Sequence, residues 1–470
     1  MVKQEKTYIG VITLALMTVA ALFSLSGLTE NAEFGFSSIF FYALTALLFF
    51  IPAALTAAFL ATRFPSGGIN VWVSKAFGKK WGLLAIWLQW IQSVTLYITI
   101  LSFAAATLAF AIDPALASNG LFLLAAILVI YWGVTLVNFR GMSLSTKVSS
   151  YGVVLGTLLP GAFLIILSLL WILEGNPIQI ELSLDAIIPE FHGINSLVLA
   201  IGGILLYSGI EMSAAHITRL RNPTVEYPRA IFLAAVIAFV VFVLGSLAIA
   251  SVVPKQNISL VAGVMEAFTA LLNNYSAGWL LPIVMLFIVG GTVAQINTWI
   301  AGPSRGLLKV AREGSLPPIF RRVNKQDMPT SILLIQAVIV TILAIIFVMM
   351  PDVSTSFWII TALTAQLYLI MYILMFAAAI SHSKSVKKKP GMFSMPGGKY
   401  GVWIIAGIGL TASILAIALG FFPPAQEQTG GLLFYEGFLI LGILILGSAP
   451  LIMYHFRKPS WVQKKAEKEY

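Results

Sequence analysis

Apolar residues recur along this chain in long stretches that are separated by short polar segments. A helix that crosses a lipid bilayer needs about 20 mostly apolar residues, so we expect each long stretch to be a transmembrane helix. The predicted spans are residues 9–29, 36–62, 82–111, 121–138, 148–173, 195–216, 230–253, 280–303, 330–350, 357–380, 401–422 and 433–456. The pattern therefore predicts an all-α integral membrane protein with 12 transmembrane helices, in which residues 1–470 form one domain.

Positive charge is distributed unevenly across these spans. Of the 28 Lys and Arg residues, all except Lys255 fall on one side of the predicted membrane, whereas acidic residues such as Glu30 and Glu33 fall in the opposite loops. Cytoplasmic loops of membrane proteins collect Lys and Arg. Because the number of spans is even, both termini lie on the same side, and we expect both to be cytoplasmic.

The composition supports a membrane protein. Hydrophobic residues make up 59% of the chain and charged residues only 10%, whereas a soluble domain carries about 25% charged residues. The net charge of +10 is spread over short loops beside apolar runs, which favours contact with anionic lipid heads over nucleic-acid binding. The absence of Cys excludes disulfides and thiol chemistry, and no nucleotide, metal or hydrolase motif is present. We therefore expect no cofactor, no metal and no enzymatic activity.

Spans one and six each contain a polar interruption. In span one the interruption includes Ser24, Ser26 and Gly27, and in span six it includes Ser208 and Gly209. Unwound backbone at membrane depth is tolerated only where it lines a cavity or is buried in protein. The two spans also begin two consecutive five-helix units, and matched interruptions of this kind indicate the binding site of an inverted-repeat transporter. The alternative is that Gly and Ser only allow close helix packing.

Glu211 is the only ionisable residue that this topology places well inside a span. Burying a charge in a membrane is expensive, so such a residue is a functional candidate. We expect Glu211 to take part in gating or proton movement. The alternative is a hydrogen-bonded carboxyl group that holds the broken helix together.

Neutral polar residues mark three further spans. Span eight carries Gln295, and the others lie in spans three and ten: Gln89, Gln92, Ser93, Thr95, Tyr97, Thr361, Thr364, Gln366 and Tyr368. Most of them can be explained as interhelical hydrogen bonds, each worth less than about 2 kcal/mol. A few that face the broken helices would suit a small polar zwitterion.

Several longer motifs resemble the amino acid–polyamine–organocation superfamily and, within it, the bacterial glutamate/GABA antiporter group. They are Leu206-Tyr207-Ser208-Gly209-Ile210-Glu211, Asn222-Pro223, Tyr227-Pro228-Arg229, Leu260-Val261-Ala262-Gly263, Trp299-Ile300-Ala301-Gly302-Pro303-Ser304-Arg305 and Met395-Pro396-Gly397-Gly398. The resemblance extends over nearly the whole chain.

This resemblance implies a LeuT-like fold with two inverted repeats of five helices, at about 9–173 and 195–380, and two peripheral helices at about 401–456. It also implies exchange of amino acids or amines by alternating access in the bacterial cytoplasmic membrane. The family's substrate site maps to Ser24, Ser26, Gly27, Tyr207, Ser208, Gly209 and Glu211. To these we add Gln295 as a substrate-binding candidate.

Two features depart from the antiporter group. Its members tend to carry an aromatic- and acid-containing stretch after the first break, whereas this chain reads Ser-Gly-Leu-Thr-Glu-Asn at 26–31. The resemblance therefore does not assign glutamate and GABA as substrates. The chain also ends soon after its last span, so we expect it to lack the C-terminal pore plug of the acid-resistance members.

The sequence thus predicts a secondary active amino-acid transporter. Some proton-coupled relatives of the superfamily carry a Lys deep within span five, and this chain has none there, so the resemblance favours exchange. The rival is proton-coupled symport, in which Glu211 or His216 would carry the proton. From a different class, the chain could be a channel or a transport-dead sensor. The expected partners are amino acids or amines and the lipid bilayer, without nucleic acid. A partner decarboxylase would make metabolic sense of amine exchange, and the sequence leaves the oligomeric state open.

Overall fold

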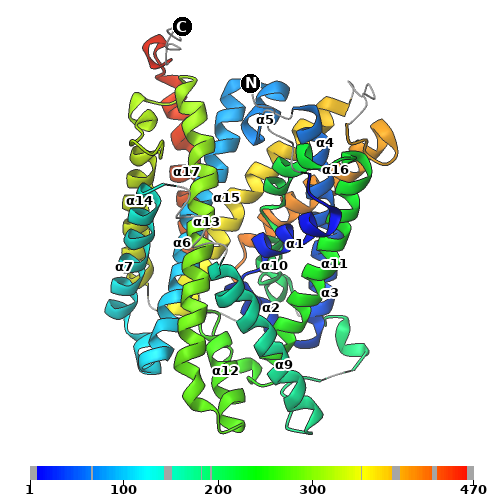
Figure 1. Ribbon diagram of the computed structural model, residues 1–470, viewed down its shortest axis with the longest axis vertical. Helices are drawn as coiled ribbons and strands as arrows, with labels where there is room; N and C mark the ends of the chain where they lie inside the picture. Colours follow the sequence, from blue (N-terminus) through cyan, green and yellow to red (C-terminus); the bar gives the residue numbers. More distant parts are fainter. Residues whose placement is uncertain are drawn as a thin grey trace.

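The computed structural model describes residues 8–64, 67–141, 151–181, 183–190, 193–350, 352–383, 392–425 and 431–462. Helices dominate these residues, and no strand occurs among them. Figure 1 shows that most of the long helices run roughly along the long axis of the molecule and pack side by side as a bundle. In the described ranges, ten helices are long and apolar enough to cross a membrane. The protein is therefore a multi-pass membrane protein.

The helices of the first half begin and end at defined residues. They are α1 (Val11–Leu22), α2 (Leu28–Ala32), α3 (Ser38–Thr45), α4 (Ile51–Arg63), α5 (Ile69–Phe77), α6 (Lys79–Ile112), α7 (Gly120–Phe139) and α9 (Leu159–Leu173). A π-helical turn, Ala46–Phe50, joins α3 to α4, so that these elements form one apolar helix from Gly35 to Arg63. A second π-helical turn, Val154–Leu158, leads into α9.

The second half continues with α10 (Ala200–Tyr207), the 3₁₀ helix η8 (Ile210–Arg219), α11 (Pro223–Ala250), α12 (Gly263–Asn274), α13 (Leu281–Arg312), α14 (Thr330–Met349), α15 (Val353–His382), α16 (Gly398–Gly420) and α17 (Leu432–His455). The short helix α12 lies in the segment 254–279, between two of the predicted spans. Helix α5, in contrast, was not predicted, because its nine residues are too few to stand out as an apolar stretch.

Burial differs strongly between the helices. Helices α6 and α15 are buried over most of their length and pack against each other, and α6 also packs against α13. Helix α17 buries only three residues and exposes apolar side chains such as Leu433 and Ile445. A helix that is apolar all round and exposed is suited to lipid rather than water. The core of the bundle therefore lies around α6 and α15, and α17 lies at its periphery.

The structure confirms an interruption in each of the two expected places. Helix α1 ends at Leu22, and α2 starts only after a 3₁₀ turn at Leu25–Gly27. Helix α10 ends at Tyr207, after which Ser208 is extended and Gly209 has a φ of +99°. That φ lies in the region that glycine adopts without steric cost. Each interruption therefore leaves unwound backbone in the interior of the bundle.

Two acidic residues do not lie where the sequence placed them. Glu30 and Glu33 were expected in loops outside the membrane, but their exposed fractions are only 3% and 6%. The reason is the break itself: after the 3₁₀ turn the chain resumes as α2, which is packed against α10 and α11. Glu30 lies within α2 and Glu33 follows it directly. The expectation that Glu211 would be the only buried ionisable residue was therefore wrong.

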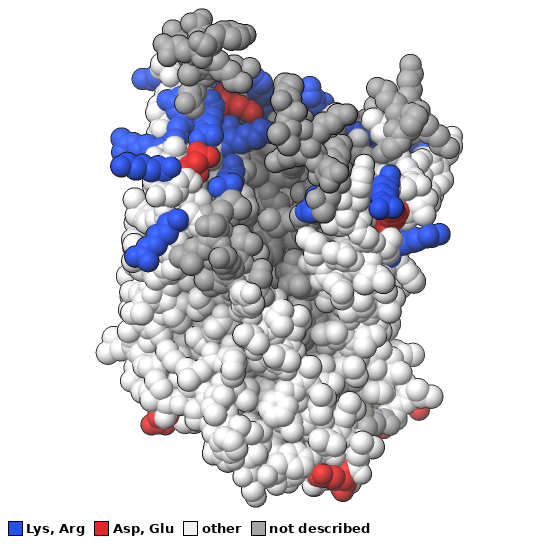
Figure 2. Space-filling model, viewed as in Figure 1, with Lys and Arg blue, Asp and Glu red and all other residues white. Residues whose placement is uncertain are grey.

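Charged side chains gather at the two ends of the molecule. Figure 2 shows the Lys and Arg residues at one end, with a few acidic residues among them, whereas only Asp and Glu are seen at the other end. The Ile9 amide donates a hydrogen bond to the Arg219 carbonyl, and Arg321 donates one to the carbonyl of Trp461. The first and last described segments are therefore tied to two of the basic segments, as the predicted topology requires.

Candidate transport site

The two interruptions meet at a small cavity. Its volume is about 60 Å³, and α6, α13 and α15 complete its walls. The polar lining residues are Ser24, Ser26, Glu30, Thr99, Ser208, Gln295 and Thr361. A cavity of about 150 Å³ is needed to hold a molecule the size of benzene. The lining residues must therefore move apart before this cavity can admit an amino acid.

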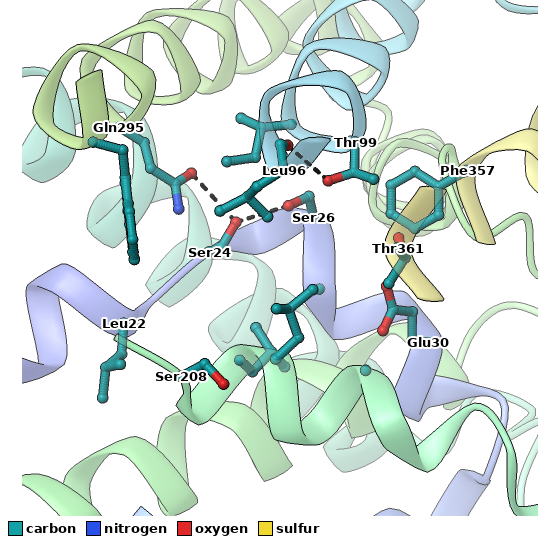
Figure 3. Close-up of a pocket in the computed structure, with 16 residues that line it drawn as sticks. Leu22, Ser24, Ser26, Glu30, Leu96, Thr99, Ser208, Gln295, Phe357 and Thr361 are labelled. Atoms are coloured by element: carbon teal, nitrogen blue, oxygen red, sulfur yellow. Dashed lines mark hydrogen bonds between the residues drawn. The ribbon is translucent and has the colours of Figure 1, made fainter. Parts of the chain in front are cut away.

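Hydrogen bonds connect the first interruption to α13 (Figure 3). The hydroxyl groups of Ser24 and Ser26 lie 2.8 Å apart, and the Ser24 hydroxyl donates to Gln295 Oε1 over 3.3 Å. Gln295 points from α13 toward this segment, which places its amide nitrogen beside the cavity. The network offers both hydrogen-bond donors and acceptors to a polar ligand.

Glu30 contributes the only charged side chain among the described residues that line the cavity. Its carboxylate rests against α10 at Gly202, where a built Cβ would lie 1.4 Å from Glu30 Oε2. Any side chain at position 202 would therefore displace the carboxylate. Gly202 of α10 thus leaves the room that the Glu30 side chain of α2 occupies.

Glu211 lies just after the second interruption and is 4% exposed. Gln89 on α6 donates to its Oε1 over 2.8 Å, and Tyr368 on α15 donates to the same oxygen over 2.7 Å. Tyr372, also on α15, donates to Oε2. Three donors from two helices thus hold the carboxylate, and Glu211 links η8 to α6 and α15.

The second interruption is packed closely against its neighbours. The Gly209 amide donates to the Tyr372 hydroxyl over 2.8 Å, and a Cβ built at Gly209 would lie 2.8 Å from the Trp299 ring. Trp299 also lines the cavity. Position 209 therefore requires glycine both for its positive φ and for the space that the indole ring occupies.

The structure brings most of the residues proposed from the sequence to the cavity. Ser24, Ser26, Gly27, Ser208 and Gln295 line it. Gly209 lies beside it through Trp299, as described above.

Tyr207 points elsewhere, into an aromatic cluster with Tyr42, Phe50 and Phe242. No described group accepts or donates a hydrogen bond at its hydroxyl. The side chain of His216 lies outside the described residues. Five of the predicted residues therefore line the cavity, whereas Tyr207 packs away from it.

Sequence reasoning missed Glu30, Thr99 and Phe357 as lining residues. A signal for Glu30 was present, since it lies three residues after Gly27 and therefore follows the interruption by one helical turn. Thr99 and Phe357 gave no comparable signal. In the described part of the chain, no cluster of His, Cys, Asp and Glu could hold a metal ion.

Comparisons with known proteins decide the family. The amino acid permease family profile matches residues 9–445 of the chain. The chain belongs to this family. It is thus a transporter of the amino acid–polyamine–organocation superfamily, and it transports amino acids or related compounds.

Individual relatives in this superfamily carry more specific names. The chain is 40% identical to an uncharacterized transporter of Legionella pneumophila over 95% of its own length and 96% of that protein. It is 33% identical to the glutamate/gamma-aminobutyrate antiporter of Lactococcus lactis, over 88% of this chain and 84% of the relative. It is 24% identical to the cadaverine/lysine antiporter of Escherichia coli, over 63% and 65% of the two lengths. The two antiporters are named for chemically different substrates, an acidic amino acid with its amine in one case and a basic amino acid with its diamine in the other.

Proposed function

We propose that this permease is an antiporter that exchanges amino acids or amines by alternating access to the cavity between its two interruptions. The names of the Lactococcus and Escherichia relatives support exchange, since both are antiporters. Ser24, Ser26, Gly27, Ser208 and Gln295 would contact the substrate. Gly209 would shape the cavity wall through Trp299, and Tyr207 would hold the end of α10 in its aromatic cluster.

The observation that carries this proposal is the meeting of two interrupted helices at one polar cavity. Interruptions free backbone amides and carbonyls from helical hydrogen bonds. Such groups can bind the carboxylate and the ammonium of an amino acid, as the half-helices of inverted-repeat transporters do. A bound substrate would stabilise the conformation in which the cavity walls surround it, relative to the conformation without substrate. This difference in stability would drive the exchange cycle.

The architecture that we propose follows from the same feature. If the two interrupted spans also cross the membrane, they would make twelve membrane spans with the ten long helices. We assign the first ten to two inverted repeats of LeuT-like topology, at about 9–173 and 195–380, with α16 and α17 as the peripheral helices. The basic end in Figure 2 would face the cytoplasm together with both termini.

Glu211 would act as the gate on the side of η8. Its three hydrogen bonds join η8 to α6 and α15, so opening that side would require these bonds to break. A decarboxylase that forms the amine inside the cell would complete an amino acid/amine cycle.

Counterflow into proteoliposomes tests the proposal. Vesicles containing the purified permease are loaded in turn with each proteinogenic amino acid and its decarboxylated amine, and uptake of a labelled partner is measured. Uptake that requires the matching internal substrate is the expected result. Uptake into empty vesicles driven by an imposed proton gradient would replace exchange with symport. No uptake of any substrate under either condition would refute transport at this site.

A further inference from the structure

The one described ionisable group in the cavity wall is acidic and not basic. Among the described lining residues Glu30 is the only charged one, and no Lys, Arg or His accompanies it. The remaining polar groups are the neutral hydroxyls and the amide of Gln295. The wall therefore offers one acidic group, and no basic one among the described residues, to whatever enters the cavity.

The Glu30 carboxylate has no partner among the residues that the structure describes. It is 3% exposed, and no described group donates a hydrogen bond to it or forms an ion pair with it. Glu211, by contrast, accepts three hydrogen bonds at a similar degree of burial. A buried carboxylate without a donor is costly unless a cation or a donor is supplied from elsewhere. The cavity that Glu30 lines is a space from which the carboxylate can receive one.

The position of the carboxylate is set by its surroundings. Gly202 leaves the space that Glu30 Oε2 occupies, and a side chain there would fill it. Thr361, whose buried hydroxyl also has no hydrogen-bond partner, lines the same cavity. Figure 3 shows Glu30 and Thr361 on one side of the cavity and Ser24 and Gln295 on the other. A ligand between them would meet the acid at one end and the serine–glutamine network at the other.

We propose that Glu30 determines substrate specificity by pairing with an ammonium group, and that the permease selects amines and amino acids with a cationic side chain over neutral and acidic ones. This assignment rests on the proposed exchange function. A charge-assisted hydrogen bond between an ammonium and a carboxylate is about twice as strong as one between neutral groups. It would supply the donor that Glu30 lacks, and an acidic side chain in the same place would be repelled.

The test compares substrates that differ mainly in the terminal group. Lysine, its decarboxylated amine cadaverine, norleucine and glutamate compete for counterflow in proteoliposomes that contain wild type, Glu30→Gln or Glu30→Asp. Glu313→Gln, the same change at an exposed position of the basic end, is the control. We expect wild type and the control to prefer lysine and cadaverine over norleucine and glutamate.

Glu30→Gln should reduce the preference for lysine over norleucine by about tenfold or more, since the lost bond involves a charged group. Glu30→Asp, which keeps the charge, should retain part of the preference. If Glu30→Gln carries no substrate, the shift in melting temperature that each ligand produces in the purified variant gives the same ranking without transport. A ranking that Glu30→Gln leaves unchanged, or a wild type that prefers norleucine or glutamate, would overturn the role of Glu30 while exchange stands. A wild type that exchanges no substrate at all would instead defeat the proposed function.

Discussion

The Ser24 hydroxyl donates a hydrogen bond to Gln295 Oε1 over 3.3 Å, which joins the unwound end of α1 to the middle of α13. The two residues are 271 positions apart in the chain. Their contact lies in the cavity wall, between the first interruption and α13. A change of charge at Gln295 should therefore alter the affinity for charged substrates.

Gln295→Glu should shift the preference toward substrates with more positive charge or with a protonated acid group. The new carboxylate would lie beside Ser24 in the cavity wall, and the selectivity between lysine and glutamine should change by about tenfold, the worth of one hydrogen bond to a charged group. Competition counterflow measures the ranking. Gln326→Glu, at an exposed position, should leave it unchanged. An unaltered ranking in Gln295→Glu would place this residue outside the binding site.

Ser26→Trp should abolish uptake while the protein remains folded. Ser26 is 8% exposed and lines a cavity of about 60 Å³, which an indole ring would fill. Overpacking of a buried position costs about 1–3 kcal/mol, so melting temperature and size-exclusion profile are recorded beside uptake. Ser460→Trp, at an exposed position near the end of the chain, is the matched control. Normal uptake by folded Ser26→Trp would contradict the assignment of the first interruption to the substrate.

Glu211→Gln should alter the pH dependence or the turnover of exchange, because the carboxylate holds η8 through three hydrogen bonds. Initial rates are measured from pH 5 to pH 8. Tyr368→Phe removes one donor but keeps the carboxylate, so it should change turnover while leaving the shape of the pH profile intact. A Glu211→Gln profile identical to that of wild type, with only a lower melting temperature, would reduce Glu211 to a structural link.

Gly156→Ala should destabilise the permease. The backbones of Gly156 and Gly291 touch, and a Cβ at Gly156 would lie 2.2 Å from the Gly291 nitrogen. Because backbone cannot give way as a side chain can, we expect a loss of about 1–3 kcal/mol, seen as a lower melting temperature in detergent. At Gly133, a Cβ would meet nothing within 4 Å, so Gly133→Ala should be neutral or slightly stabilising. Equal changes in melting temperature in the two variants would show that the close contact does not contribute to stability.

Single cysteines should establish the orientation in the membrane. The chain contains no Cys, so a cysteine introduced at one position can be labelled without background. Lys255→Cys and Lys75→Cys both replace exposed lysines. In intact cells an impermeant maleimide should label position 255, and it should label position 75 only after the cells are opened. The reverse pattern would invert the proposed topology.

Much of the fold could be predicted because the membrane imposes simple rules. Length and apolarity indicate a spanning helix, and Gly or Ser within such a stretch indicates a break. Ser24, Ser26 and Gln295 were found in this way, as polar residues in apolar surroundings that proved to line one cavity. The hydrogen bonds that Gln89 and Tyr368 donate to Glu211 show that these two residues face a broken helix.

Glu30 shows why the rest of the site could not be predicted. Counting apolar residues ended the first span at residue 29, because the count cannot tell that α2, which carries Glu30, packs against α10 and α11. The fit of Glu30 against Gly202 joins two elements that are far apart in the chain. Tyr207 shows the converse: it lies in a motif of the family, but its ring packs with Tyr42 and Phe242 instead of lining the cavity.

The segment η8 would become shorter if it changed from a 3₁₀ helix to an α-helix. Its 10 residues, Ile210–Arg219, are wound as a 3₁₀ helix, whereas most 3₁₀ segments run for only three or four residues. At about 2.0 Å per residue they extend over roughly 20 Å, against roughly 15 Å for an α-helix of the same residues. Rewinding η8 as an α-helix would draw Arg219 about 5 Å toward the second interruption. Because the Arg219 carbonyl accepts a hydrogen bond from the Ile9 amide, the same contraction would pull on the start of α1, and the two broken spans would move together.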